Sequence, residues 1–223
     1  MSSLFNMDSP IMRFLSRVCD IMILNILCIV FCIPIITAGA SVTAMYTVTL
    51  KMVRGEEAYI FKGFLKAFKE NFKQSTIIWL IMAAVGIFIY IDYRSTAFLP
   101  GNMSTVFQIL IGALAIIYFM ILVYIFPYTA RFINNIKNIF KNSLLIAILN
   151  LPWTILLMGI PLGLGFITFS TASTLIYGSM LWLFFGFAGV AYVCSIVLRK
   201  VFEKYEPHDN EDDGNELPEI SEK

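Results

Sequence analysis

Charge is scarce in this sequence. Charged residues make up 14% of its 223 residues, against about 25% in ordinary soluble domains. No ionisable side chain lies in the middle of a long apolar run, and Asp20, Asp92 and Arg94 lie near the ends of such runs. Ionisable groups at membrane depth are the usual sign of a proton relay or an ion site. Their absence argues against a proton- or ion-coupled transporter.

Recognisable catalytic motifs are absent as well. The single histidine, His208, lies in an acidic segment, and there is no H-E-x-x-H, no phosphate loop and no nucleophile with a matching base. The four cysteines form no C-x-x-C pair, because Cys28 and Cys32 are four residues apart. We therefore expect no enzymatic activity, no cofactor, no metal site and no nucleic-acid partner.

Apolar residues are abundant instead. They account for 59% of the chain, and the mean hydropathy is +0.80, which is typical of a protein whose main solvent is lipid. The predicted fold within residues 1–202 is all-α, a polytopic transmembrane helical bundle with two or three cytoplasmic interfacial helices. Segments near 20 residues are long enough to cross the hydrocarbon core. Six spans are predicted, at about 18–36, 37–53, 75–93, 104–127, 144–167 and 173–198.

Residues 37–53 admit two interpretations. The segment is only moderately hydrophobic and is rich in Ala, Gly, Ser and Thr. Because small side chains let helices approach closely, we interpret it as a span packed against its neighbours, with Gly39, Ser41 and Thr43 in the packing face. A re-entrant segment is the alternative.

Two segments combine an apolar face with a basic face at helical spacing. They lie at about 58–73 and 131–142, and residues 64–78 (FLKAFKENFKQSTII) align without gaps to 132–146 (FINNIKNIFKNSLLI). An internal duplication explains this similarity, and so does the common composition of juxtamembrane helices. We expect the apolar faces to meet the headgroup region while the lysines face anionic lipid or a protein partner. These lysines are Lys62, Lys66, Lys69, Lys73, Lys137 and Lys141.

Basic residues are distributed unevenly about the predicted spans. With six spans and a cytoplasmic N-terminus, fifteen of the sixteen Lys and Arg residues fall on the cytoplasmic side, and only Arg94 falls outside. Because basic residues favour the cytoplasmic side, both termini are predicted to be cytoplasmic. Residues 203–223 hold nine of the fifteen acidic residues and are predicted to form a disordered acidic cytoplasmic tail.

A few polar residues and prolines lie deep within the predicted spans. Asn25 and Asn150 carry amide groups, and Pro152 frees a backbone carbonyl close to Asn150. Such groups usually hold neighbouring helices together; contact with a neutral solute is the alternative. Asn150 with Pro152 is the best candidate for a functional kink.

Several motifs resemble those of the YesL-type family of bacterial membrane proteins, a domain of unknown function. They are the segments 39–46 (GASVTAMY), 51–57 (KMVRGEE) and 68–74 (FKENFKQ), and Pro127 with Arg131. The resemblance covers roughly residues 10–200. It implies a bacterial cell-membrane protein, commonly encoded beside binding-protein-dependent sugar importers and glycan-degrading enzymes.

Two functional hypotheses follow. The first is a non-enzymatic accessory or interaction component of carbohydrate uptake that contacts the permease of an ABC-type importer. The alternative is a permease in its own right, which moves a neutral solute such as a sugar past Asn25, Asn150 and the prolines. The two differ in whether the protein transports anything when it is alone.

Overall fold

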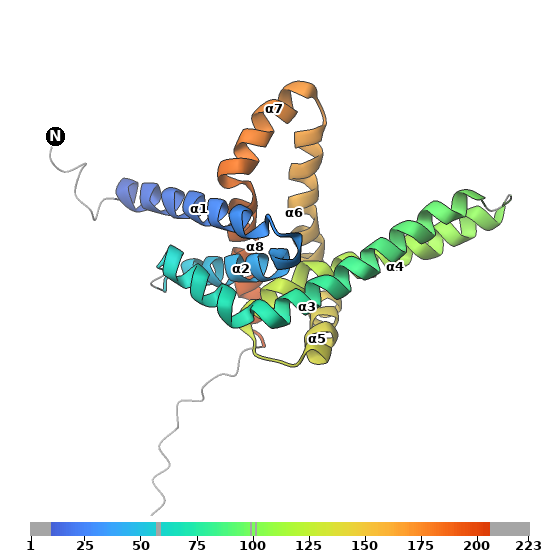
Figure 1. Ribbon diagram of the computed structural model, residues 1–223, viewed down its shortest axis with the longest axis horizontal. Helices are drawn as coiled ribbons and strands as arrows, with labels where there is room; N and C mark the ends of the chain where they lie inside the picture. The colour runs from blue at the N-terminus through green and yellow to red at the C-terminus, as the bar shows by residue number, and fades with distance from the viewer. Residues whose placement is uncertain (1–9, 57–58, 99, 101, 206–223) are drawn as a thin grey trace, which may run out of the picture.

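The computed structural model describes residues 10–56, 59–98, 100 and 102–205, and all regular structure in these residues is helical (Figure 1). The predicted all-α class is therefore confirmed. A π-helical turn, Trp182–Gly186, joins the last two helices. The helices are α1 (Pro10–Cys32), α2 (Ala38–Arg54), α3 (Ile60–Ser95), α4 (Asn102–Arg131), α5 (Ile136–Leu149), α6 (Leu151–Phe169), α7 (Ala172–Leu181) and α8 (Phe187–Phe202).

Helix α2 lies at the centre of the fold. It packs against α1, α3, α4 and α8, and its small residues explain why so many helices can surround it. Ala40, Ser41, Thr43 and Ala44 are fully buried. The segment that is least hydrophobic among the predicted spans is thus the one most enclosed by protein.

Helix α2 ends at a glycine in the left-handed conformation. Gly55 has a φ of 76°, its N–H donates to the carbonyl of Met52, and the N–H of Glu56 donates to the carbonyl of Lys51. These bonds satisfy carbonyls at the helix end, and glycine adopts this φ without the steric cost of a Cβ. The chain can then turn directly into α3.

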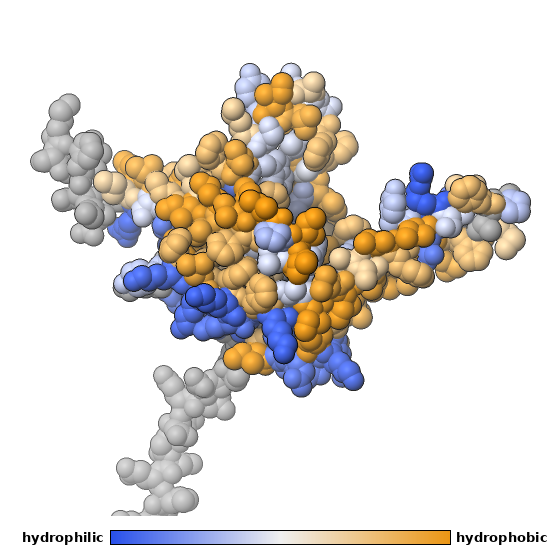
Figure 2. Space-filling view, in the orientation of Figure 1, coloured by the Kyte–Doolittle hydropathy of each residue, from blue (hydrophilic) through white to orange (hydrophobic). Residues whose placement is uncertain are grey.

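Two helical hairpins project from this centre in different directions, one made of α3 and α4 and the other of α6 and α7, while α1 lies across the base of the second (Figure 1). The hairpins carry large exposed apolar side chains, such as Phe88, Phe166 and Phe169. Figure 2 shows this apolar colouring along both projections. Surfaces of this kind and extent are expected in a protein surrounded by lipid.

Five helical segments of the described residues are long and apolar enough to cross a membrane: Ile11–Cys32, Ile60–Phe98, Asn102–Arg131, Leu151–Phe169 and Ala172–Phe202. Helix α2, with 17 residues, is not among them. The count of six spans therefore remains a prediction that depends on whether α2 crosses the bilayer.

Several helix ends differ from the boundaries predicted for the spans. The basic segment 58–73 and the span 75–93 form one continuous helix, α3. Residues 132–135 are not helical, and α5 begins only at Ile136. The predicted span 144–167 is divided at Asn150, as Pro152 led us to expect of a kink. Of the predicted acidic tail, residues 206–223 lie outside the described part.

The close contact of α2 with α3 gives a prediction for Gly39. A Cβ added at this glycine would lie 2.5 Å from the Cβ of Trp79 and 2.6 Å from the carbonyl oxygen of Ser75. Neither atom can move without shifting α3. We expect Gly39→Ala to lower stability by about 1–3 kcal/mol, measured by thermal unfolding in detergent micelles.

Gly63→Ala is the matched control, because the nearest atom to its added Cβ belongs to the Val48 side chain, at 3.8 Å. Helix propensity alone favours alanine over glycine by about 1 kcal/mol, so this variant should be as stable as the native protein or more so. Equal behaviour of the two variants would contradict the close approach at Gly39.

Candidate functional site

The lysines of α3 lie on one exposed face. Lys62, Lys66, Lys69 and Lys73 are all exposed, and only Lys66 has an ion-pair partner among the described residues, Glu70 at 4.0 Å. Figure 2 shows hydrophilic side chains gathered over this half of α3 and over α5. We call the six residues Lys62, Lys66, Lys69, Lys73, Lys137 and Lys141 the lysine surface.

The apolar face of the same half of α3 is covered by protein. Phe64 is fully buried and Ala67 nearly so, and the ring of Phe31 in α1 packs edge-on against Phe64 and Phe68 at centroid distances of 5.5 and 4.8 Å. The headgroup region was expected to receive this face. Instead α1 and α2 cover much of it, and Phe61 and Phe72 remain exposed.

The structure brings the two basic segments together. The side-chain amide of Gln74 in α3 donates to the backbone carbonyl of Asn134, just before α5. An open groove of about 580 Å³ runs between the two helices. It is lined by Glu70, Lys73, Gln74, Ile77, Asn135, Ile136 and Lys137. The two parts of the lysine surface therefore adjoin at this groove, where Lys73 and Lys137 lie.

The loop that leads into α5 is held by a tyrosine. The hydroxyl of Tyr128 accepts hydrogen bonds from the amides of Asn134 and Asn142, both at 2.8 Å. The Tyr128 ring stacks on Phe132 at 4.8 Å. These contacts fix the position of Lys137 relative to α4.

Equivalent positions of the two aligned segments have similar environments. Ser75 and Ser143 are both fully buried, and neither hydroxyl has a hydrogen-bond partner among the described residues. Ile78 and Ile146, three residues further on, are buried too. The alignment was informative here, because it pairs these serines, although sequence reasoning had given them no role.

Asn25 in α1 is bound to the π-helical turn. Its amide nitrogen lies 3.1 and 2.7 Å from the carbonyl oxygens of Trp182 and Leu183, and its carbonyl oxygen accepts from the N–H of Ala188 at 2.9 Å. A π-helical turn shifts the backbone hydrogen bonds by one residue and leaves groups at its ends in need of partners. Asn25 supplies those partners and is fully buried.

The polar residues of α2 also bond to protein atoms. The Ser41 hydroxyl donates to the carbonyl of Cys28 at 2.9 Å, and the Thr43 hydroxyl donates to the carbonyl of Gly39 at 2.9 Å. Further along α2, the hydroxyls of Thr49 and Ser195 lie 2.8 Å apart. The Ser41 bond joins α2 to α1 and the Thr49 bond joins α2 to α8, whereas the Thr43 bond lies within α2.

Asn150 lies at the break between α5 and α6. Its side-chain amide donates to the carbonyl of Ile146 at 3.0 Å and to the hydroxyl of Tyr205 at 2.9 Å. The Thr154 hydroxyl donates to the carbonyl oxygen of Ala147 at 2.8 Å, across the break. Next to Pro152, the side chains of Asn150 and Thr154 thus bond to backbone carbonyls at the end of α5.

The residues predicted to lie deep within the spans therefore form two separate clusters. Asn25, Ser41, Thr43 and Gly39 lie around α2, whereas Asn150 and Pro152 lie at the α5–α6 break near the end of α8. None of them lines the groove between α3 and α5 or the cavities within the two hairpins. Their contacts are those of groups that hold helices together.

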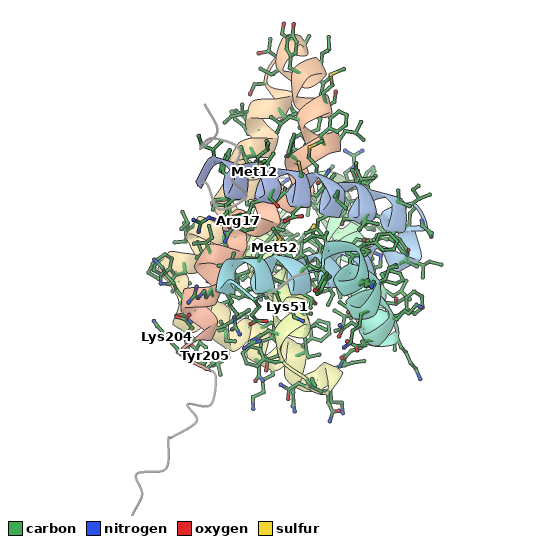
Figure 3. The ribbon with its side chains drawn as sticks, turned by 90° about the vertical axis from the view of Figure 1, so that its left-hand side faces the viewer. Met12, Arg17, Lys51, Met52, Lys204 and Tyr205 are labelled. Atoms are coloured by element: carbon green, nitrogen blue, oxygen red, sulfur yellow. The ribbon has the colours of Figure 1, made fainter. Side chains whose placement is uncertain are left out.

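Two long-range arginine contacts escaped sequence reasoning. The guanidinium group of Arg17 donates to the hydroxyl of Tyr192 at 2.8 Å, and that of Arg199 donates to the carbonyl of Val53 at 3.1 Å. Figure 3 shows Arg17 on α1, and it shows the ends of α2 and α8, marked by Lys51 and Lys204, on the lower side of the molecule. Nothing in the local sequence pairs residues so far apart.

Comparison with known proteins finds a family model and a relative with similar sequences. A family model described as "Protein of unknown function, DUF624" matches residues 21–93, the region of α1, α2 and α3. The uncharacterized protein YesL of Bacillus subtilis (strain 168) is 25% identical over 139 residues, which cover 60% of this chain and 65% of that protein. The resemblance to the YesL-type family is confirmed.

The match to YesL spans less than two thirds of that protein's own length. No solved structure matches the chain. The YesL-type motifs at 39–46 and 68–74 fall in the buried part of α2 and beside the groove of α3. The described residues contain no group of three or more His, Cys, Asp or Glu arranged to hold a metal ion; the absence of enzymatic activity stays a prediction.

The bonds of Asn25 yield a stability prediction. Asn25→Leu keeps the approximate size of the side chain but leaves the N–H of Ala188 and two carbonyl groups without this partner. We expect a loss of about 1–3 kcal/mol, measured by thermal unfolding in detergent.

Ser75→Ala serves as the control, since it removes a buried hydroxyl that has no hydrogen-bond partner in the described part of the chain. Its stability should be unchanged or slightly higher. A native-like melting temperature for Asn25→Leu would show that the π-helical turn does not depend on this amide.

Proposed function

We propose that this YesL-type protein is a non-enzymatic, multi-pass protein of the bacterial cell membrane whose lysine surface contacts anionic lipid and a protein partner on the cytoplasmic side. The observation that carries the proposal is the union of the two basic segments into one exposed surface. Six lysines with few internal partners form a site for negatively charged groups.

Two contacts near the lysine surface support its placement on the same side of the membrane as the end of α8. The amide of Asn150, at the end of α5, bonds to Tyr205, and Arg199 bonds to the end of α2. Both basic segments and the start of the acidic region therefore share one side of the molecule. Under the positive-inside rule, that side is the cytoplasmic one.

The buried polar residues favour an accessory role over independent transport. Asn25, Ser41, Thr43 and Asn150 direct their hydrogen bonds to protein atoms. A solute pathway would need polar groups that face a cavity. The proposed partner is the permease of a carbohydrate ABC-type importer, and the support for this partner is the family resemblance alone.

Reconstitution and affinity purification together test this function. In liposomes, the purified protein should carry no sugar across the bilayer, and from native membranes it should co-purify with an importer's permease. Sugar flux by the protein alone would instead favour the alternative, a stand-alone permease for a neutral solute.

The lysine surface gives a topological prediction. Replacing Lys62, Lys66, Lys69 and Lys73 with glutamate should weaken membrane insertion or invert the local topology, since each lysine contributes about 1 kcal/mol with anionic lipid. Labelling of introduced cysteines on intact cells measures the change. The same four positions changed to arginine keep the charge and should behave as the native protein does. Normal topology of the glutamate variant would count against the placement.

A further inference from the structure

We propose that the groove between α3 and α5 binds the chain's own acidic C-terminal segment, residues 206–223. The inference goes beyond the proposed function, because it holds whatever partner or lipid the rest of the lysine surface contacts. It assigns one occupant to one groove, and the argument uses charge, side-chain pattern and reach.

Charge complementarity is the first step. Residues 206–223 contain eight acidic side chains and a single basic one, Lys223. Lys73 and Lys137 line the groove from opposite helices, and neither has an ion-pair partner among the described residues. The one acid in the groove, Glu70, lies 4.0 Å from Lys66. The groove thus offers two unmatched positive charges to an acidic peptide.

The second step is the pattern of side chains. Between its lysines the groove presents Ile77 and Ile136. The segment 216–220 reads ELPEI, in which Glu216 and Glu219, and likewise Leu217 and Ile220, are three residues apart. In a polyproline II conformation, which has three residues per turn, Leu217 and Ile220 can face the isoleucines of the groove while Glu216 and Glu219 reach the lysines.

The third step is reach. The acidic segment starts directly after Tyr205, whose hydroxyl is held 2.9 Å from the amide of Asn150 at one end of α5. The groove lies at the other end of α5, about 22 Å away at 1.5 Å per residue. Eleven extended residues, from Tyr205 to Glu216, span about 36 Å. A tethered segment this close has an effective concentration in the millimolar range, so weak contacts suffice.

Zero-length cross-linking of carboxylates to amines tests the proposal on the full chain in neutral detergent, with the linked peptides identified by mass spectrometry. Cross-links from residues 211–219 should fall mainly on Lys73 and Lys137. Lys51 is the control, since it is an exposed lysine on the same side. Raising the ionic strength to about 1 M, which shortens the screening length to about 3 Å, should remove most of them. Equal yields at Lys51, Lys73 and Lys137 would overturn the proposal.

Two further cross-linking experiments distinguish the acidic segment from other possible occupants of the groove. Leu217→Ser with Ile220→Ser keeps the charge of the segment and should reduce the yield at Lys73 and Lys137 several-fold; an unchanged yield would overturn docking in the groove. In nanodiscs that contain phosphatidylglycerol the cross-links should persist. Their loss there would assign the groove to a lipid headgroup and reject the acidic segment as its occupant. Neither experiment depends on co-purification of a permease.

Discussion

The close packing of α2 is the constraint on which the rest of the fold depends. Its small side chains let four helices approach it, and at Gly39 the backbone of α3 comes so near that no Cβ fits without movement. Without a hydrophobic driving force between helices in lipid, such van der Waals contact and the hydrogen bonds of Ser41 and Thr49 must supply the association. The position of α3, and with it that of four of the six lysines of the lysine surface, follows from this contact.

Different parts of the molecule are built for different surroundings. The hairpins expose Phe88 and Phe166, as lipid permits. In the centre, the amides of Asn25 and Asn150 and the hydroxyls of Ser41 and Thr49 bond to other protein groups. The lysines lie apart from both, on the side where α5 and the end of α8 meet. The apolar hairpins, the buried polar contacts and the lysine surface therefore occupy separate parts of the molecule. This separation is the physical basis for proposing that the lysine surface interacts with partners.

Much of this arrangement could be read from spacing. The periodicity of α3 indicated that Lys66, Lys69 and Lys73 would be exposed opposite Phe64, and the small residues near Gly39 indicated a packing face. Pro152 correctly marked a break. Local patterns could not show that Asn25 reaches backbone groups more than 150 residues away, or that Phe31 covers the apolar face of α3, because such contacts are decided by tertiary packing. The directions in which the two hairpins project could not be predicted from the sequence, because they too are decided by tertiary packing.

The continuity of α3 has a mechanical consequence. The helix runs for 36 residues without a proline, which corresponds to about 54 Å. Helix α2 packs along the basic half of α3, since Val48 lies against Gly63 and Gly39 lies against Trp79. That half is therefore fixed to the centre of the fold, and any rigid displacement of the lysines would be carried through the helix to the apolar half that projects with α4.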